Sequence, residues 1–105
     1  MSDIWVLYST FANKGEAVSV AEKLVNDRHI ACANVHENIT SIYRWEGQLK
    51  RDTEVVLFAK TQKNKVSGAI AAVKRLHSYE VPCIIAYPMG EGYLPYLQWV
   101  ADETS

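Results

Sequence analysis

The run from Val55 to Ala59 consists of five consecutive apolar residues inside a strand-like segment. Successive side chains of a strand point to opposite faces, so a half-exposed strand alternates apolar and polar residues. This run is apolar on both faces, and both must therefore be covered. A chain of 105 residues has few elements with which to cover them. We expect helices on one face and a partner subunit on the other, which predicts an oligomer.

The composition is that of an ordinary globular protein and predicts a single domain, residues 1–105. Hydrophobic residues make up 49% and charged residues 22%, and the net charge of -1 argues against a nucleic-acid binder. No apolar run approaches the ~20 residues of a membrane helix. The N-terminal segment lacks a basic region and enters a strand directly, so we expect no signal peptide and a cytoplasmic protein. Cys32 and Cys83 are then expected to be reduced.

The pattern predicts an α+β fold of the ferredoxin-like βαββαβ type, with a short C-terminal helix. Strands are expected at 4–10, 31–43, 48–60 and 83–87, with a bulge at 34–38 and a long hairpin turning at 45–47. Asn13 and Thr61 are the predicted N-caps of the first two helices. The last helix begins near Leu94, with Pro95 in its first turn. The two longer helices would cover one sheet face and leave the other open.

Four segments in order resemble the CutA family, small proteins named for divalent-cation tolerance. The first two are A-C-A-N at 31–34 and T-S-I-Y-R-W-E-G at 40–47. The others are H-S-Y-E-V-P at 77–82 and Y-L-Q-W-V at 96–100. Together they span nearly the whole chain. The resemblance implies the same ferredoxin-like fold and a homotrimer in which the long hairpin reaches a neighbouring subunit.

The resemblance also implies a relation to copper or another divalent cation. Candidate ligands are His77, Glu80, Cys32 and Cys83. Two of them have a structural alternative: His77 as a helix-terminal side chain held by a carboxylate or backbone carbonyl, and Cys32 as a small buried strand residue. The chain departs from the family pattern in two places of this region, with Ser78 where Pro is usual and Cys83 where Glu is usual. No cofactor is expected to be obligatory.

Some family members have a Cys at the end of the first strand and a His pair before the Tyr of the H-P-Y segment, as copper ligands. Here these positions are Ser9 and Leu76-His77. Only His77 remains, which argues against copper binding in that mode. Cys83 is the substitute partner that the sequence offers for His77.

The resemblance also implies a ligand cleft between subunits, bordered by the segment at 77–82 and by hairpin residues. A ligand there would involve Trp45, Lys60 and Tyr79, together with His77 and Glu80. Lys60 is either an anion contact or a strand-end side chain that extends to water. Tyr43 and Trp45 are expected to pack at the hairpin rather than to stack on bases, because the central strand lacks the aromatic platform of RNA-binding domains.

We expect a protein that is not an enzyme, because the sequence has no Gly-rich phosphate loop and no G-x-S-x-G or H-E-x-x-H motif. The predicted function is that of a trimeric protein in the tolerance of divalent metal ions, copper especially. Metal binding by the protein is one way in which it would serve this function. Two alternatives are a small-molecule sensor, like the PII signalling trimers, and a scaffold that docks a partner. Metal ions and other copies of the chain are the expected partners, and nucleic acids and membranes are not.

Overall fold

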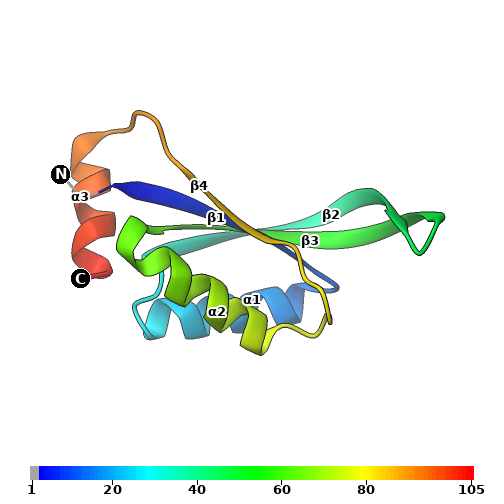
Figure 1. Cartoon of the computed structure of the whole chain (residues 1–105). Coiled ribbons are helices and arrows are strands. Elements are labelled where there is room, and N and C mark those ends of the chain that lie inside the picture. Colours follow the sequence, from blue (N-terminus) through cyan, green and yellow to red (C-terminus); the bar gives the residue numbers. More distant parts are fainter. Residues whose placement is uncertain (1–2) are drawn as a thin grey trace.

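The computed structural model describes residues 3–105, so the first two residues of the predicted domain lie outside the described residues. The strands and helices of this part of the chain alternate in the predicted order (Figure 1). Their bounds are β1 (Ile4–Phe11), α1 (Lys14–Asn26), β2 (Cys32–Trp45), β3 (Gln48–Gln62), a 3-10 turn η1 (Lys63–Lys65), α2 (Val66–Leu76), β4 (Ile84–Pro88) and α3 (Leu94–Glu103).

The four strands form one antiparallel sheet in the order β2-β3-β1-β4. The central strands β3 and β1 are therefore neighbours in space although α1 and β2 separate them in the chain. This order confirms the predicted ferredoxin-like fold. Each βαβ half places its helix on the same side, so α1 and α2 cover one face of the sheet (Figure 1).

The core lies between that face and the two helices. Leu7 and Phe11 of β1 and Leu57 of β3 are almost fully buried there, together with Leu24 of α1 and Val73 of α2. Strand alternation turns the intervening residues to the opposite, open face. The apolar run of β3 is thus divided between two faces, as its composition predicted.

The predicted bulge is present in β2, where the pairing register shifts between His36 and Ile39 and Asn38 has a φ of 61°. Beyond the bulge, the described strands β2 and β3 pair only with each other, because β1 pairs with β3 from Val55 onward. The hairpin therefore projects past the rest of the sheet (Figure 1). Glu46 and Gly47 form its two-residue turn.

One predicted helix cap is confirmed and the other is wrong. The Asn13 side chain accepts a hydrogen bond of 2.8 Å from the Glu16 backbone N–H at the start of α1. Thr61 does not cap α2, because β3 continues to Gln62 and η1 precedes the helix. The buried Thr61 hydroxyl instead donates to the carbonyl oxygen of His29 at 2.7 Å. Thr61 therefore ties β3 to the segment after α1.

Helix α3 lies at the end of the sheet away from the hairpin (Figure 1). Its buried residues Leu97 and Val100 pack with Ile4 and Ala31 in a second apolar cluster. Ile4 lies on the face of β1 opposite its core-facing residues, so α3 covers one end of the open face. Within residues 3–105, none of the helices has the length and apolar character needed to cross a membrane.

Candidate functional site

His77 follows the last turn of α2 and has its side chain fully buried. Its ring stacks on Phe11 with 4.3 Å between ring centroids and an interplanar angle of 14°. Nδ1 accepts a 3.0 Å hydrogen bond from the Tyr79 backbone N–H, and Nε2 lies 2.7 Å from the Thr10 carbonyl oxygen. An N–H donor at Nδ1 and a carbonyl acceptor at Nε2 fix the tautomer with its proton on Nε2. Both ring nitrogens are therefore occupied by the backbone.

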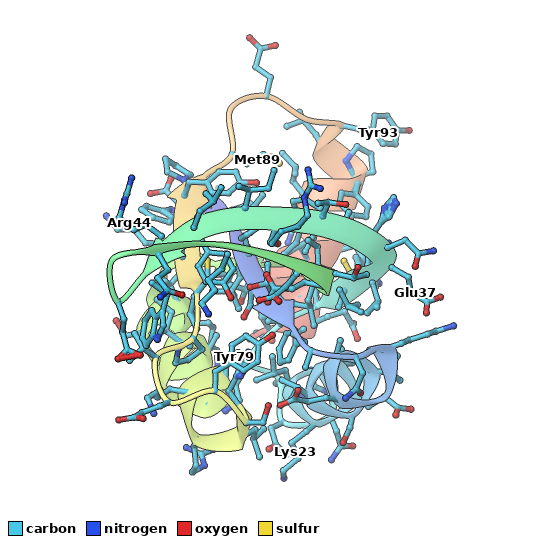
Figure 2. All side chains as sticks on the ribbon, turned by 90° about the vertical axis from the view of Figure 1, so that its right-hand side faces the viewer. Lys23, Glu37, Arg44, Tyr79, Met89 and Tyr93 are labelled. Atoms are coloured by element: carbon cyan, nitrogen blue, oxygen red, sulfur yellow. The ribbon has the colours of Figure 1, made fainter. Side chains whose placement is uncertain are left out.

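The segment after His77 is held against α1 and β3. The Ser78 backbone N–H donates to the Glu16 carboxylate at 2.7 Å. The Tyr79 hydroxyl donates to Oε2 of Glu54 at 2.7 Å. Figure 2 looks at the molecule from the hairpin end and shows Tyr79 on this segment. These contacts fix the Tyr79 ring beneath the base of the hairpin.

A groove of about 630 Å³ lies between this segment and the hairpin. This volume is within the range of small-molecule sites, roughly 300–1,000 Å³. The wall comes from β1, from both hairpin strands and from the chain between α2 and β4. Its residues are Tyr8, Thr10, Ser41, Ile42, Tyr43, Trp45, Asp52, Glu54, Tyr79, Glu80, Val81 and Cys83.

Phenols and carboxylates are paired in the wall. Besides the contact between Tyr79 and Glu54, the Tyr43 hydroxyl hydrogen-bonds the Asp52 carboxylate. Desolvation and then the hydrogen bond to Glu54 raise the pKa of Tyr79, and the hydrogen bond to Asp52 is the largest cause of the raised pKa of Tyr43. Desolvation raises the pKa of Tyr8 as well. A raised pKa keeps these phenols protonated at neutral pH.

The predicted metal ligands do not converge. Cys32 pairs with Lys60 in the register, and Lys60 lies opposite Val6 of β1. Ser9, three residues further along β1, donates to the backbone carbonyl of Cys83, so these cysteines are separated by about 10 Å along the strand. The Cys32 thiol contacts the Tyr96 hydroxyl at 3.2 Å instead.

The remaining chemistry of these residues also disfavours a metal site. Desolvation, followed by the nearby Glu54 charge, raises the pKa of the Cys83 thiol, whereas a metal ligand must be the thiolate. Within residues 3–105 no group of three or more His, Cys, Asp or Glu side chains is arranged to hold a metal ion. The structural alternative considered for His77 describes its surroundings correctly. The residues present do not fit a metal centre built by one chain.

The predicted ligand cleft is reproduced only in part. Trp45 and Tyr79 line the groove, and so do Glu80 and Cys83 from the predicted metal set. Lys60 lies six residues from Glu54 along β3, about 20 Å away, and its ammonium group donates to the Asn34 side chain at 2.7 Å. Lys60 is therefore not part of this groove within one chain.

Sequence reasoning missed Tyr8, Asp52 and Glu54 as groove residues. The alternation of β1 contained a usable signal, because Tyr8 and Thr10 fall on the face opposite Leu7 and Phe11. The carboxylates carried no such signal. Their position depends on how far the hairpin bends over the segment after α2, and the bulge sets this bend.

Comparison with known sequences identifies the relatives of this chain. The sequence profile described as CutA1 divalent ion tolerance protein matches residues 5–103. A Xenopus laevis protein named Protein CutA homolog is 45% identical over 90% of this chain and 63% of its own length. The divalent-cation tolerance protein CutA of Thermus thermophilus is 38% identical over 94% and 96% of the two chains. The chain spans 54–63% of the length of the vertebrate relatives it matches.

Solved structures show the same fold. The crystal structure of CutA from Xylella fastidiosa superposes with a TM-score of 0.96 at 32% identity, over 99% of this chain and all of that one. A CutA structure from Archaeoglobus fulgidus, described as periplasmic, has a TM-score of 0.94 at 31% identity and covers 97% and 99% of the two chains. The α+β fold and its long hairpin are thus those of these proteins.

The prediction of a cytoplasmic protein is wrong. The Archaeoglobus relative is described as periplasmic, and the rice and Arabidopsis relatives are named chloroplastic. The plant relatives are also about twice as long as the region they share with this chain. Proteins are directed to compartments by targeting segments rather than by the folded domain, so this fold carries no cytoplasmic signature.

Proposed function

Since this chain belongs to the CutA1 divalent ion tolerance protein family, we propose that it acts in the tolerance of divalent metal ions as a homotrimer joined through the open face of its sheet. The observation that carries the assembly is the apolar centre of that face. Tyr8 lies opposite Phe58 on one side and Ile85 on the other. Ile85 is 51% exposed and Phe58 is 36% exposed.

These residues form a patch rather than scattered surface side chains. Tyr8 and Phe58 meet edge to face with 5.3 Å between centroids, and Tyr87 extends the row along β4 with 43% of its surface exposed. A contiguous apolar patch on a sheet face marks an interaction surface. α1 and α2 occupy the other face, so a second copy is the simplest cover. The number three is taken from the family resemblance.

In this proposal the protein serves the tolerance of divalent cations but does not hold one as a resident cofactor. Both ring nitrogens of His77 contact backbone groups, and within residues 3–105 no three or more His, Cys, Asp or Glu side chains are grouped to hold a metal ion. Native mass spectrometry of the reduced protein with Cu(I), Cu(II) or Zn(II) tests this point. We expect no stoichiometric retention by a single chain. One metal retained per chain, and lost in His77→Asn, would contradict it.

The groove supports a second candidate, a sensor of a small molecule within the same trimer. The groove has a volume of about 630 Å³, and its wall combines apolar and polar side chains, as ligand sites do. A trimer that senses a ligand would serve metal tolerance indirectly.

Growth under copper or zinc stress tests the proposed function in cells that lack their own homologue. Expression of this protein should restore tolerance. Ile85→Glu should abolish the effect by placing charge in the apolar patch, whereas Val25→Glu, on the exposed side of α1, should leave it intact. Failure of the unmodified protein would overturn the tolerance role. Full rescue by a monomeric Ile85→Glu protein would overturn the need for assembly.

A further inference from the structure

The longest part of the chain without a carboxylate surrounds α2. Residues 55–79 contain five of the 11 Lys and Arg residues and none of the 12 Asp and Glu residues. The other six cations therefore stand against all 12 carboxylates, and the rest of the chain has a net charge of -6. Four of the five are Lys63, Lys65, Lys74 and Arg75, in η1 and α2. Charge gathered in this way attracts an anionic partner to one surface.

These four cations are available to a partner. Three of them are exposed and Lys65 is half-buried. None of the four is in an ion pair within residues 3–105. The Lys63 ammonium lies 5.8 Å from the centre of the Trp5 ring, a contact that leaves its positive charge unneutralised. Because α2 covers the sheet face opposite to the one that the proposed assembly occupies, the helix stays accessible in that assembly (Figure 1).

Small side chains separate the two pairs of cations along the outer side of α2. Ser67 and Ala71 are exposed and lie one helical turn apart, and Lys74 follows on the same side of the helix. The helix rises by about 14 Å from Lys65 to Lys74, at about 1.5 Å per residue. A partner segment can therefore lie close to the helix and reach the cations at both of its ends.

The rest of the molecule favours one kind of anionic partner. A membrane or a nucleic acid is an extended polyanion and would also meet the neighbouring α1, whose two Lys residues are balanced by Glu16 and Glu22. Interfacial membrane helices insert large apolar side chains, and single-stranded nucleic acids stack on aromatic rings. The outer side of α2 presents only Ser67 and Ala71 at its centre. A short acidic protein segment contacts α2 alone and avoids the negative remainder of the chain.

We propose that the outer face of α2, from Lys63 to Arg75, docks an acidic segment of a partner protein. Asp or Glu side chains of that segment would accept hydrogen bonds from the cations at both ends of the helix, and its middle would lie over the small side chains between them. The face belongs to a single chain and lies across the sheet from the proposed assembly. The proposal therefore depends neither on the trimer nor on a role in metal tolerance.

Peptides of one length that differ only in charge provide the test. Acetylated and amidated peptides of about twelve residues alternate Ser with Glu, Gln or Lys, and each is long enough to span the face when extended. Binding to the whole isotope-labelled protein is followed by NMR chemical shifts, with the protein's mass determined in the same buffer. We expect the Glu peptide to bind at least about tenfold more tightly than the Gln peptide and to shift resonances of α2. Added salt should weaken this binding, and the Lys peptide should not bind to α2.

Two double variants remove the cations at either end of the face. Lys74→Gln with Arg75→Gln changes the C-terminal end, and Lys63→Gln with Lys65→Gln changes the N-terminal end. Each pair should weaken binding of the Glu peptide by about fivefold or more, because each removes two charged contacts. Thermal melts establish that the variants fold, and either pair alone suffices if the other does not fold.

The hairpin provides a matched control. Lys50→Gln with Arg51→Gln also removes two exposed cations and changes the net charge by the same amount. It should leave the affinity for the Glu peptide within about twofold of the unmodified protein, since screened charges away from the contact contribute little. Vesicles that contain phosphatidylserine and a thymidine oligonucleotide are offered to the same proteins, and both should bind more weakly than the Glu peptide.

Three results would overturn the proposal. Equal affinity for the Glu and Gln peptides would show that the face does not recognise charge. Unchanged affinity in both α2 variants, or an equal loss in the hairpin control, would place the binding elsewhere. Tighter binding of the vesicles or the oligonucleotide, lost in the α2 variants, would assign the face to a membrane or a nucleic acid. A protein that fails these tests and still restores metal tolerance would leave the proposed function standing.

Discussion

Nε2 of His77 lies 2.7 Å from the carbonyl oxygen of Thr10, and this contact joins the end of α2 to the end of β1. The ring stacks on Phe11, and its Nδ1 accepts a hydrogen bond from the Tyr79 backbone N–H. The imidazole therefore acts as a neutral structural bridge. It also fixes the start of the segment that carries Tyr79 into the groove.

Replacing this bridge should be costly. His77→Ala leaves a cavity beside Phe11 and an unsatisfied Thr10 carbonyl, so we expect the free energy of unfolding to fall by about 3 kcal/mol. Urea denaturation at one fixed protein concentration measures it, because the proposed assembly would make stability depend on concentration. The exposed His36→Ala is the matched control and should change stability by less than about 0.5 kcal/mol. Equal midpoints for the two variants would refute the structural role.

The hairpin turn holds a residue other than Gly, Glu46, at a positive φ. Glu46 and Gly47 have φ values of 49° and 78°, the type I′ arrangement that favours Asn-Gly. Glu46→Asn should therefore raise stability by about 0.5 kcal/mol, and Gly47→Ala should lower it by about 1 kcal/mol, although a Cβ at 47 meets no neighbour. Thermal melts of both variants check the opposite signs. A stabilising Gly47→Ala would contradict the turn geometry.

The side-chain amide of Gln62 hydrogen-bonds the C-terminal end of α3. Gln62 at the end of β3 donates to the Ala101 carbonyl at 3.0 Å and to the Thr104 hydroxyl at 2.9 Å. Gln62→Leu removes both of these part-buried hydrogen bonds, so it should cost about 1–2 kcal/mol. Gln98→Leu removes only an exposed bond to Asp102 and should cost much less. Faster hydrogen exchange confined to α3 in Gln62→Leu is the expected local signature.

Stability at alkaline pH should depend on Tyr96. Its hydrogen bond with the Cys32 thiol, followed by desolvation, raises the pKa of the phenol to about 12 from an ordinary value of 10.0. The folded state thus keeps a proton that the unfolded state releases, and this stabilisation is complete below pH 10. Stability must then fall as the pH rises from about 10 to 12.

Tyr96→Phe removes this titration. Its unfolding midpoint should decline less between pH 10 and 12 than that of the unmodified protein, whereas Tyr93→Phe, on a largely exposed side chain, leaves the decline unchanged. Urea denaturation across this range measures the difference. An identical decline in Tyr96→Phe and the unmodified protein would show that the Cys32 contact does not form.

Much of the fold was readable from the sequence because its signals are local. The apolar run in β3, the Asn13 cap, the polar interruption that became the β2 bulge and the hairpin turn all follow from residue type and period. The prediction that Thr61 caps α2 was wrong because a capping Thr and a buried Thr in a strand have the same local sequence signature. Only the contact with His29, 32 residues away, distinguishes them.

The site was less readable because it depends on distances between elements. The sequence singled out His77 and Tyr79, but their partners Thr10 and Glu54 come from other parts of the chain. Sequence order does not show how far along a strand a cleft lies, so it could not show that Lys60 and the groove are separated along β3. For the same reason it could not show that Cys32 and Cys83 lie at different levels of the sheet.

Sedimentation equilibrium of the unmodified, reduced protein at micromolar concentration tests the central claim most directly. If copies cover the apolar row of Tyr8, Phe58 and Ile85, the mass will be about 35 kDa, three times the 11.8 kDa chain, and Ile85→Glu will reduce it. A single species of 11.8 kDa for the unmodified protein would contradict the account, because the open face would then remain exposed to water.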